Sequence, residues 1–142
     1  MSNKNNPLSI ENQLCFPLYA AAKEVIKKYT PYLKPLGLTY TQYIAMMILW
    51  EEKEVTAAHL GERLHLDSGT LTPMLKKMEQ GGLISRRRSS VDERNLLVTI
   101  TQQGIDLRRK ALKVPAQMAQ CVSLSAQEAE TLYNLLYKLL DN

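Results

Sequence analysis

The sequence is poor in the residues that build metal centres and disulfide-stabilised domains. It contains 2 cysteines and 2 histidines in 142 residues, and the cysteines, Cys15 and Cys121, lie near opposite ends of the chain. This spacing fits neither the paired ligands of a zinc site nor the cysteine framework of a small secreted domain. We therefore expect no metal site, no cofactor and no disulfide framework.

Long apolar runs and a secretory signal are missing as well. The longest apolar run, "YIAMMILW" over residues 43–50, is much shorter than the roughly 20 residues that cross a bilayer. The first ten residues, "MSNKNNPLSI", have no hydrophobic signal core. These absences predict a cytoplasmic protein that makes no membrane contact.

What is present is ordinary globular composition with a modest excess of positive charge. Hydrophobic residues make up 45% of the chain and charged residues 23%, which suits one domain with a core. The formal net charge of +4 favours a polyanionic partner only mildly. The charge is concentrated, however, because four arginines lie close together, at Arg86, Arg87, Arg88 and Arg94.

Apolar periodicity and capping residues predict a mainly helical chain with one β-hairpin. Helices are expected over about 6–29, 40–52, 56–64, 68–80, 101–121 and 125–140, and strands over 83–88 and 96–101. Thr39 and Ser125 each begin a capping-box pattern. Pro17 is expected to disturb the first helix, Pro115 to bend the fifth, and residues 31–37 to form a break.

Two short helices followed directly by a hairpin are typical of a winged helix. We expect a winged helix-turn-helix DNA-binding region over about residues 40–101. It is flanked by N-terminal helices over about 6–35 and C-terminal helices over about 102–142. Since these terminal helices carry apolar stripes wider than they can bury alone, we expect them to form a homodimer.

The helix over residues 68–80 has the two faces of a DNA-recognition helix. Its apolar face has the i, i+3, i+4, i+7 spacing of a core face and comprises Leu71, Met74, Leu75 and Met78. The other side carries hydroxylated residues and then two lysines: Ser68, Thr70, Thr72, Lys76 and Lys77. We expect this side to enter the major groove and contact phosphates, although a solvated amphipathic helix would show the same pattern. Pro73 implies that the helix starts late or bends.

The polar tip between the two strands is expected to act as a DNA-binding wing. Its basic residues, Arg86, Arg87, Arg88 and Arg94, would form a prong that reaches into a minor groove. Asp92 stands two residues before Arg94, where its carboxylate could hold the guanidinium group in one orientation. The alternative is a weak surface ion pair.

These segments resemble a known family. "DSGTLTPMLKKMEQGGLISR" followed by "DERNLLVTIT" is similar to the recognition helix and wing of the MarR family of winged-helix repressors. "NQLCFPLY", with the later "GLTYTQYIAMMILWE", resembles the organic-hydroperoxide-sensing branch of that family. The resemblance covers about residues 10–120. It implies a homodimer that binds a palindromic operator in double-stranded DNA and releases it when organic hydroperoxide oxidises a cysteine.

The resemblance also implies roles for individual residues. Cys15 matches the sensing cysteine, Tyr29 and Tyr40 match the tyrosines that hydrogen-bond it, and Asp92 with Arg94 match the wing pair. Pro17 departs from the leucine or alanine that the branch has at this position. The straightness of the helix around Cys15 is therefore an open point.

A reactive cysteine must be partly ionised, and the surroundings of Cys15 bear on this requirement. We expect Cys15 to lie beyond the first helical turn, and no basic residue is near it in sequence, so tyrosine hydroxyls remain as donors. Tyr29 is 14 residues further along the same expected helix, roughly 21 Å away at 1.5 Å per residue. If Tyr29 serves Cys15, it must come from a second subunit. An inert core cysteine is the alternative.

Cys121 is the candidate resolving thiol, because a sulfenic acid condenses readily with a second thiol. A disulfide between Cys15 and Cys121 of two subunits is one hypothesis, and an apolar spacer at Cys121 with a small cellular thiol as resolver is the other. Two rival functions remain: a repressor released by a phenolic ligand, and a thiol peroxidase. We expect no enzyme, since no thioredoxin-like pattern is present and an enzyme has no need of the arginine wing.

Overall fold

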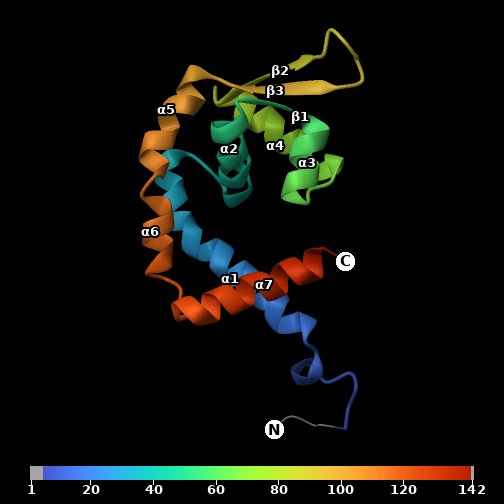
Figure 1. Ribbon diagram of the computed structural model, residues 1–142, viewed down its shortest axis with the longest axis vertical. Coiled ribbons are helices and arrows are strands. Elements are labelled where there is room, and N and C mark those ends of the chain that lie inside the picture. The colour runs from blue at the N-terminus through green and yellow to red at the C-terminus, as the bar shows by residue number, and fades with distance from the viewer. Residues whose placement is uncertain (1–4, 142) are drawn as a thin grey trace.

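The computed structural model describes residues 5–141, and its architecture is the expected one, mainly α with a small antiparallel sheet (Figure 1). The helices are α1 (Cys15–Leu33), α2 (Tyr40–Glu52), α3 (Ala57–Leu64), α4 (Ser68–Gln80), α5 (Gln102–Ala111), α6 (Val114–Ala119) and α7 (Ala126–Leu140). The strands are β1 (Glu54–Thr56), β2 (Ile84–Arg88) and β3 (Leu96–Ile100), and short 3-10 turns occupy Ile10–Asn12 and Lys34–Leu36. No helix within residues 5–141 is long and apolar enough to cross a membrane.

The winged helix occupies the upper half of the molecule in Figure 1. Helices α2, α3 and α4 pack below a three-stranded sheet with the order β1-β3-β2, in which all pairings are antiparallel. The β2–β3 hairpin was expected, whereas β1 was not, because three residues are too short to show a strand periodicity. Thr56 and Asp67 cap α3 and α4 by accepting hydrogen bonds from main-chain N–H groups.

The first helix begins later than expected. It starts at Cys15, because Gln13 has extended backbone that separates α1 from the preceding 3-10 turn. Pro17 favours this start, since its ring would clash with the carbonyl group of a helical Gln13 four residues earlier, and Gln13 adopts extended backbone instead. Pro17 itself lies in the first turn of α1, where its missing N–H has no helical partner to lose. Pro17 thus disturbs the helix expected over residues 6–29 by delaying its start, and it leaves the remaining helix α1 uninterrupted.

The other end of α1 extends further than expected. The helix continues through Pro31 to Leu33, so the predicted break at residue 31 is wrong. Leu33 is only 1% exposed and belongs to the core. The free energy gained by burying the Leu33 side chain offsets the free energy lost with the helical hydrogen bond that Pro31 cannot make. The break follows at Lys34–Leu36 and ends at Gly37, whose φ of 72° favours glycine.

The single bent helix expected over residues 101–121 is in fact two helices. Helix α5 ends at Ala111, and α6 begins at Val114 with Pro115 in its first turn. The ring of Pro115 clashes with a helical carbonyl at Ala111, four residues earlier, so the chain breaks there rather than bending.

Gly104 lets α5 pack tightly against the wing. A Cβ atom at this position would overlap the Leu83 carbonyl oxygen and lie 2.7 Å from Cγ1 of Ile100. The Gly104 carbonyl also accepts a hydrogen bond of 2.8 Å from Nε1 of Trp50. This junction therefore tolerates no side chain.

We expect Gly104→Ala to lower the free energy of unfolding by about 1–3 kcal/mol, because overpacking forces the wing and α5 apart. Gly81→Ala is the matched control, since a Cβ there meets its nearest atom at an ordinary 3.4 Å. Urea denaturation of both variants measures the difference. Equal stability of the two variants would contradict the packing argument.

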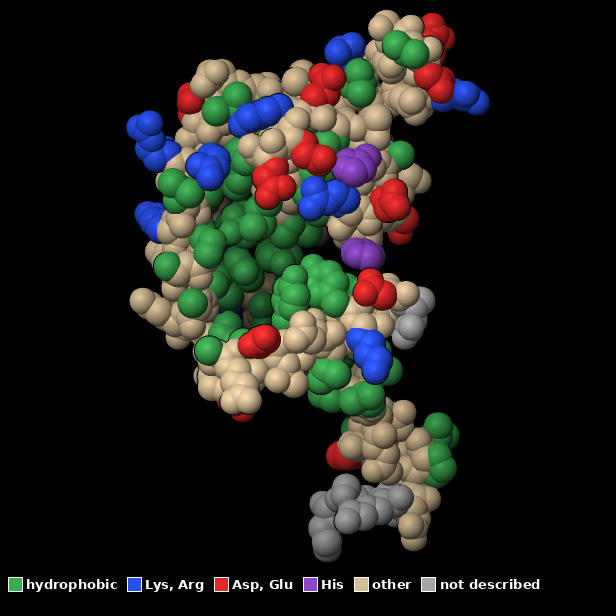
Figure 2. Space-filling model, in the orientation of Figure 1, with side chains coloured by type: hydrophobic (Ala, Val, Ile, Leu, Met, Phe, Trp, Pro, Cys, Tyr) green, Lys and Arg blue, Asp and Glu red, His purple; other side chains and the backbone are tan. Residues whose placement is uncertain are grey.

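The terminal helices expose the apolar faces that their sequences predicted. No side chain of α7 is buried, and Leu33 is the buried residue of α1. The exposed apolar side chains of the two helices include Phe16, Leu18, Tyr19, Val25, Ile26, Leu132, Tyr133, Leu135, Tyr137, Leu139 and Leu140. Figure 2 shows hydrophobic side chains gathered in a hollow beneath the winged helix and on the helices below it. A surface of this kind marks an interaction site.

Candidate DNA-reading face and cysteine sites

Helix α4 has the two faces expected of a recognition helix. Leu71, Met74, Leu75 and Met78 are buried in the core. The polar residues expected to face DNA are all exposed: Ser68, Thr70, Thr72, Lys76 and Lys77. Asp67 caps the helix by accepting a hydrogen bond of 2.8 Å from the N–H of Thr70. The helix runs from Ser68 through Pro73, so of the two alternatives given for Pro73 the late start is excluded.

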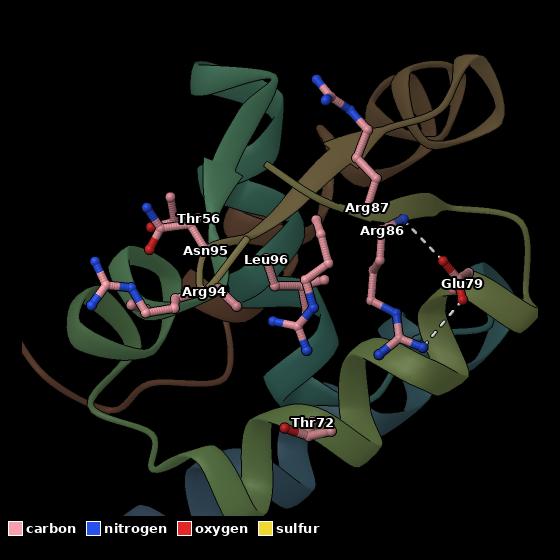
Figure 3. Close-up of a pocket in the computed structure, with 11 residues that line it drawn as sticks. Thr56, Thr72, Glu79, Arg86, Arg87, Arg94, Asn95 and Leu96 are labelled. Atoms are coloured by element: carbon pink, nitrogen blue, oxygen red, sulfur yellow. Dashed lines mark hydrogen bonds and ion pairs between the residues drawn. The ribbon is translucent and has the colours of Figure 1, made fainter. Parts of the chain in front are cut away.

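A groove separates α4 from the wing and continues the exposed face of α4. Its volume is about 570 Å³. The lining residues with polar or charged side chains are Thr56, Thr72, Glu79, Arg86, Arg87, Arg88, Arg94 and Asn95. Four arginines thus belong to the lining of one groove beside the recognition helix, and of these Arg87 directs its side chain away from the groove (Figure 3). A surface of this charge suits a phosphate backbone.

Arg86 does not extend outward as the expected prong requires. Figure 3 shows its side chain pointing from β2 toward α4, where two hydrogen bonds join it to Glu79. The main-chain N–H of Arg86 donates to Oε2 of Glu79 at 2.9 Å, and its Nη2 donates to Oε1 at 3.2 Å. Hydrogen bonding from Arg86 lowers the pKa of the Glu79 carboxyl. Arg86 therefore braces the wing against α4.

Arg87 lies on the opposite face of β2 and points away from Arg86 (Figure 3). Its Nη2 is 3.5 Å from Oε2 of Glu54 on β1. Arg88 is exposed at the end of the strand. The three arginines of β2 thus do not form one outward cluster, because Arg86 binds Glu79 and Arg87 pairs with Glu54. The sequence analysis did not identify these two glutamates as partners.

The expected contact between Asp92 and Arg94 is present at the tip of the wing. Oδ1 of Asp92 accepts from Nε of Arg94 at 3.0 Å, and Oδ2 accepts from Nη2 at 3.1 Å. Hydrogen bonding to Arg94 lowers the pKa of the Asp92 carboxyl. The side chain of Arg94 remains 89% exposed. The carboxylate therefore orients a guanidinium group that still faces solvent.

Cys15 is the first residue of α1 and is exposed. The expectation that it lies beyond the first turn is therefore wrong, and the cause is the late start of the helix imposed by Pro17. The N-terminal end of a helix favours negative charge. No hydrogen bond to the Cys15 side chain occurs within the described part of its own chain.

Tyr29 and Tyr40, the two tyrosines expected to act together, do lie together. Their ring centroids are 4.8 Å apart, and Tyr43 completes a cluster of three rings. Burial raises the pKa of all three hydroxyl groups. None of these hydroxyls has a hydrogen-bond partner among the residues that the structure describes. The cluster therefore offers protonated donors that are still free to bind an acceptor.

Cys121 lies in the connection between α6 and α7 and is half-buried. Its Sγ is 3.3 Å from the hydroxyl oxygen of Tyr32, and its carbonyl oxygen accepts a hydrogen bond of 3.2 Å from Nζ of Lys28. Both partners are on α1 and were missed in the sequence. Their one available signal was the spacing of four residues between Lys28 and Tyr32, which places both on one face of the helix.

The two cysteines of one chain are far apart. Cys121 contacts α1 at Lys28 and Tyr32, whereas Cys15 begins that helix. Between 13 and 17 residues of helix separate these points, which corresponds to roughly 20–26 Å at 1.5 Å per residue. A disulfide needs Cα atoms within about 7 Å. A bond between the two cysteines within one chain would therefore require the fold to open.

Comparisons with known proteins agree with this architecture. The family profile of the transcriptional regulator SarA/Rot matches residues 27–110. The organic hydroperoxide resistance transcriptional regulator of Bacillus subtilis is 47% identical over 141 residues, which cover 99% of this chain and 96% of that protein.

Among solved structures, reduced AbfR bound to DNA has 35% identity and a TM-score of 0.76, covering 93% of this chain and 91% of AbfR. Disulfide-formed AbfR has 37% identity and a TM-score of 0.66, with 92% of each chain covered. A mutant of MarR from E. coli, complexed with operator DNA, has 27% identity and a TM-score of 0.81, covering 89% of this chain and 93% of MarR.

An exposed recognition helix beside an arginine-bordered groove, carried on a helix-turn-helix with a β-hairpin wing, defines a winged-helix DNA-binding transcription regulator. The chain belongs to the MarR family of these regulators, in the branch of the organic hydroperoxide resistance regulators. The relatives in the comparisons are transcription regulators rather than enzymes.

Proposed function

We propose that this protein is a redox-sensing repressor. It binds a palindromic operator as a homodimer and releases it when an organic hydroperoxide oxidises Cys15. The single observation that carries the proposal is the tyrosine cluster, whose unpartnered hydroxyls lie near the opposite end of the helix that Cys15 begins. Such donors suit a sulfur that arrives from a second subunit.

A two-fold dimer would bring these parts together. In such a dimer the same surface of both chains forms the interface, so a contact of one residue with a second residue of the partner occurs twice. The exposed apolar faces of α1 and α7 are the surfaces to be covered. If the two α1 helices cross in opposite directions, Cys15 of each chain approaches Tyr29 and Tyr40 of the other. The sensor is then built from both subunits.

The DNA contacts follow from the exposed residues of each subunit. Thr70 and Thr72 on α4 would contact base edges in the major groove, and Lys76 and Lys77 would contact phosphates. Arg94, oriented by Asp92, would enter the adjacent minor groove. Two such heads related by two-fold symmetry require a palindromic site.

The oxidation would proceed in two balanced steps. The Cys15 thiolate attacks the terminal oxygen of the hydroperoxide, the O–O bond breaks and an alkoxide leaves, which takes up the proton that the thiol lost on ionisation. The products are a sulfenic acid on Cys15 and the alcohol of the peroxide. The Cys121 thiol of the other subunit then attacks that sulfenic sulfur, which forms a disulfide and releases water. Lys28 and Tyr32 support this pairing because they anchor Cys121 to the segment of α1 that also carries Tyr29, where the Cys15 of the other subunit would bind.

Non-reducing electrophoresis of the purified protein after stoichiometric cumene hydroperoxide tests this pairing. The wild-type protein is expected to run as a disulfide-linked dimer, since the two cysteines of one chain are too far apart to bond. Cys121→Ser is expected to remain monomeric under these conditions while its Cys15 is still oxidised, which mass spectrometry detects. A wild-type protein that runs only as monomer, with Cys121→Ser behaving identically, would contradict the inter-subunit disulfide.

A further inference from the structure

We propose that Tyr32 is a positioning residue for disulfide closure, acting on the Cys121 thiol during the second oxidation step. This inference rests on the proposed function, because it concerns how Cys121 reacts with the sulfenic acid on the partner's Cys15. It adds a residue on α1 to the redox site and assigns it to one of the two steps.

The hydrogen bonds around the sulfur define the role of Tyr32. Sγ of Cys121 lies 3.5 Å from the carbonyl oxygen of Gln117 and 3.3 Å from the hydroxyl oxygen of Tyr32. A carbonyl oxygen can only accept, so the thiol proton is directed to Gln117. The Tyr32 hydroxyl then donates its proton to the sulfur. The two contacts come from different elements, α6 and α1, and together they hold the sulfur in one orientation.

The main chain at Cys121 is held by the same segment of α1. Nζ of Lys28 donates to the Cys121 carbonyl, and Lys28 lies one turn before Tyr32 on the same face of the helix. Without the contacts to Lys28 and Tyr32, Cys121 would be held only by its hydrogen bonds to Gln117 and Met118 on α6. Tyr29 precedes Tyr32 by three residues, so the two side chains are neighbours on the surface of α1. The sulfur that Tyr32 contacts is therefore held on the segment of α1 that carries the tyrosine cluster, where the partner's Cys15 would bind.

The chemistry of the closing step explains why a donor is needed. As the Cys121 sulfur attacks, the new S–S bond forms, the S–O bond of the sulfenic acid breaks, and the hydroxyl group leaves as water with the thiol proton. Negative charge develops on the attacking sulfur as its proton leaves. The Gln117 carbonyl cannot stabilise that charge, whereas the Tyr32 hydroxyl can, because it donates a hydrogen bond. Hydrogen bonding to Cys121 raises the pKa of Tyr32, so this hydroxyl stays protonated.

Tyr32→Phe tests the role because it keeps the ring, which packs against the core, and removes only the hydroxyl. The matched control is Thr30→Val, which removes an exposed hydroxyl from the same segment of α1. Reduced full-length protein is mixed with cumene hydroperoxide and quenched at intervals. Dimedone trapping with mass spectrometry follows the sulfenic acid on Cys15, and non-reducing electrophoresis follows the disulfide.

We expect Tyr32→Phe to form the sulfenic acid at the wild-type rate and to close the disulfide about tenfold more slowly, so that trapped sulfenic acid accumulates. The factor of ten corresponds to the loss of one hydrogen bond to a charged sulfur. Thr30→Val is expected to match the wild type in both steps. A role in packing alone would lower thermal stability and leave the ratio of sulfenic acid to disulfide unchanged, which would overturn the proposal.

Two further results separate this inference from the proposed function. A wild-type protein that forms sulfenic acid but no disulfide overturns the second oxidation step itself, and the role of Tyr32 with it. A wild-type protein that forms the disulfide at the same rate as Tyr32→Phe overturns only the role of Tyr32. If Tyr32→Phe unfolds, Lys28→Met removes the second anchor from an exposed position, and its disulfide must also close more slowly; an unchanged rate overturns the proposal.

Discussion

Cys15→Ser is expected to bind the operator as tightly as the wild-type protein and to remain bound after treatment with organic hydroperoxide. The wild-type protein should lose about 100-fold in affinity under the same treatment, which lies in the usual range of coupling between two sites. The variant should keep its affinity for the operator because Cys15 is exposed at the start of α1, far from the recognition helix, and its replacement changes no DNA contact. Fluorescence anisotropy with labelled operator at fixed salt concentration measures the dissociation constant of each protein before and after hydroperoxide treatment.

Rival mechanisms give different results in the same assay. A repressor released by a phenolic ligand would respond to that ligand equally in both proteins and to hydroperoxide in neither. A Cys15→Ser protein that hydroperoxide still releases would show that another group is the sensor. Cys121→Ser is the matched control, since it keeps the sensing thiol and removes only the proposed resolving thiol.

The structure also suggests how oxidation at Cys15 would reach the DNA-reading heads. Helix α1 is continuous from Cys15 to Leu33, and Leu33 is buried in the core of the winged helix. A change in how two α1 helices cross would therefore rotate each core with its recognition helix. Glu79 and Arg86 join that helix to the wing, so the two DNA-contacting elements would move as one body.

Elements with strong local signals could be predicted from the sequence to the residue. Helix α2 begins after a Thr39 capping box and α4 ends where Gly81 follows, and both have the predicted bounds. These signals act within a few residues and need no tertiary contact. The start of α1 was predicted wrongly because the apolar periodicity continues before Cys15, whereas Pro17 excludes helix there.

The arrangement of the sites could be predicted only in part. The contact between Asp92 and Arg94 was predictable because the two residues lie close in sequence. The inward direction of Arg86 was predictable from the alternation of side chains along a strand. Arg86 shares a face of β2 with the buried Ile84, and Arg87 lies on the other face. The contact of Tyr32 with Cys121 joins residues 89 positions apart, and no sequence pattern reports such a distance.

Arg94→Ala is expected to weaken operator binding by about 30-fold or more. A contact of one arginine with DNA contributes about 1–3 kcal/mol, and a two-fold dimer loses two of them, which together correspond to about 2–6 kcal/mol. Asp92 holds the guanidinium group in place before DNA arrives, so little rotamer freedom is left to lose on binding. Anisotropy titrations at several salt concentrations measure the loss.

Arg87→Ala is the matched control for Arg94→Ala, because it removes the same charge from the same hairpin. Arg87 lies on the face of β2 opposite Arg86 and is paired with Glu54, so we expect its loss to change operator affinity by less than about threefold, within the range of a long-range charge effect. Equal losses for the two variants would mean that the wing contributes only its total charge. A large loss of operator affinity for Arg94→Ala alone would mean that the oriented guanidinium group at the wing tip makes a specific contact with DNA. In a two-fold dimer on a palindromic operator, each subunit would make this contact once.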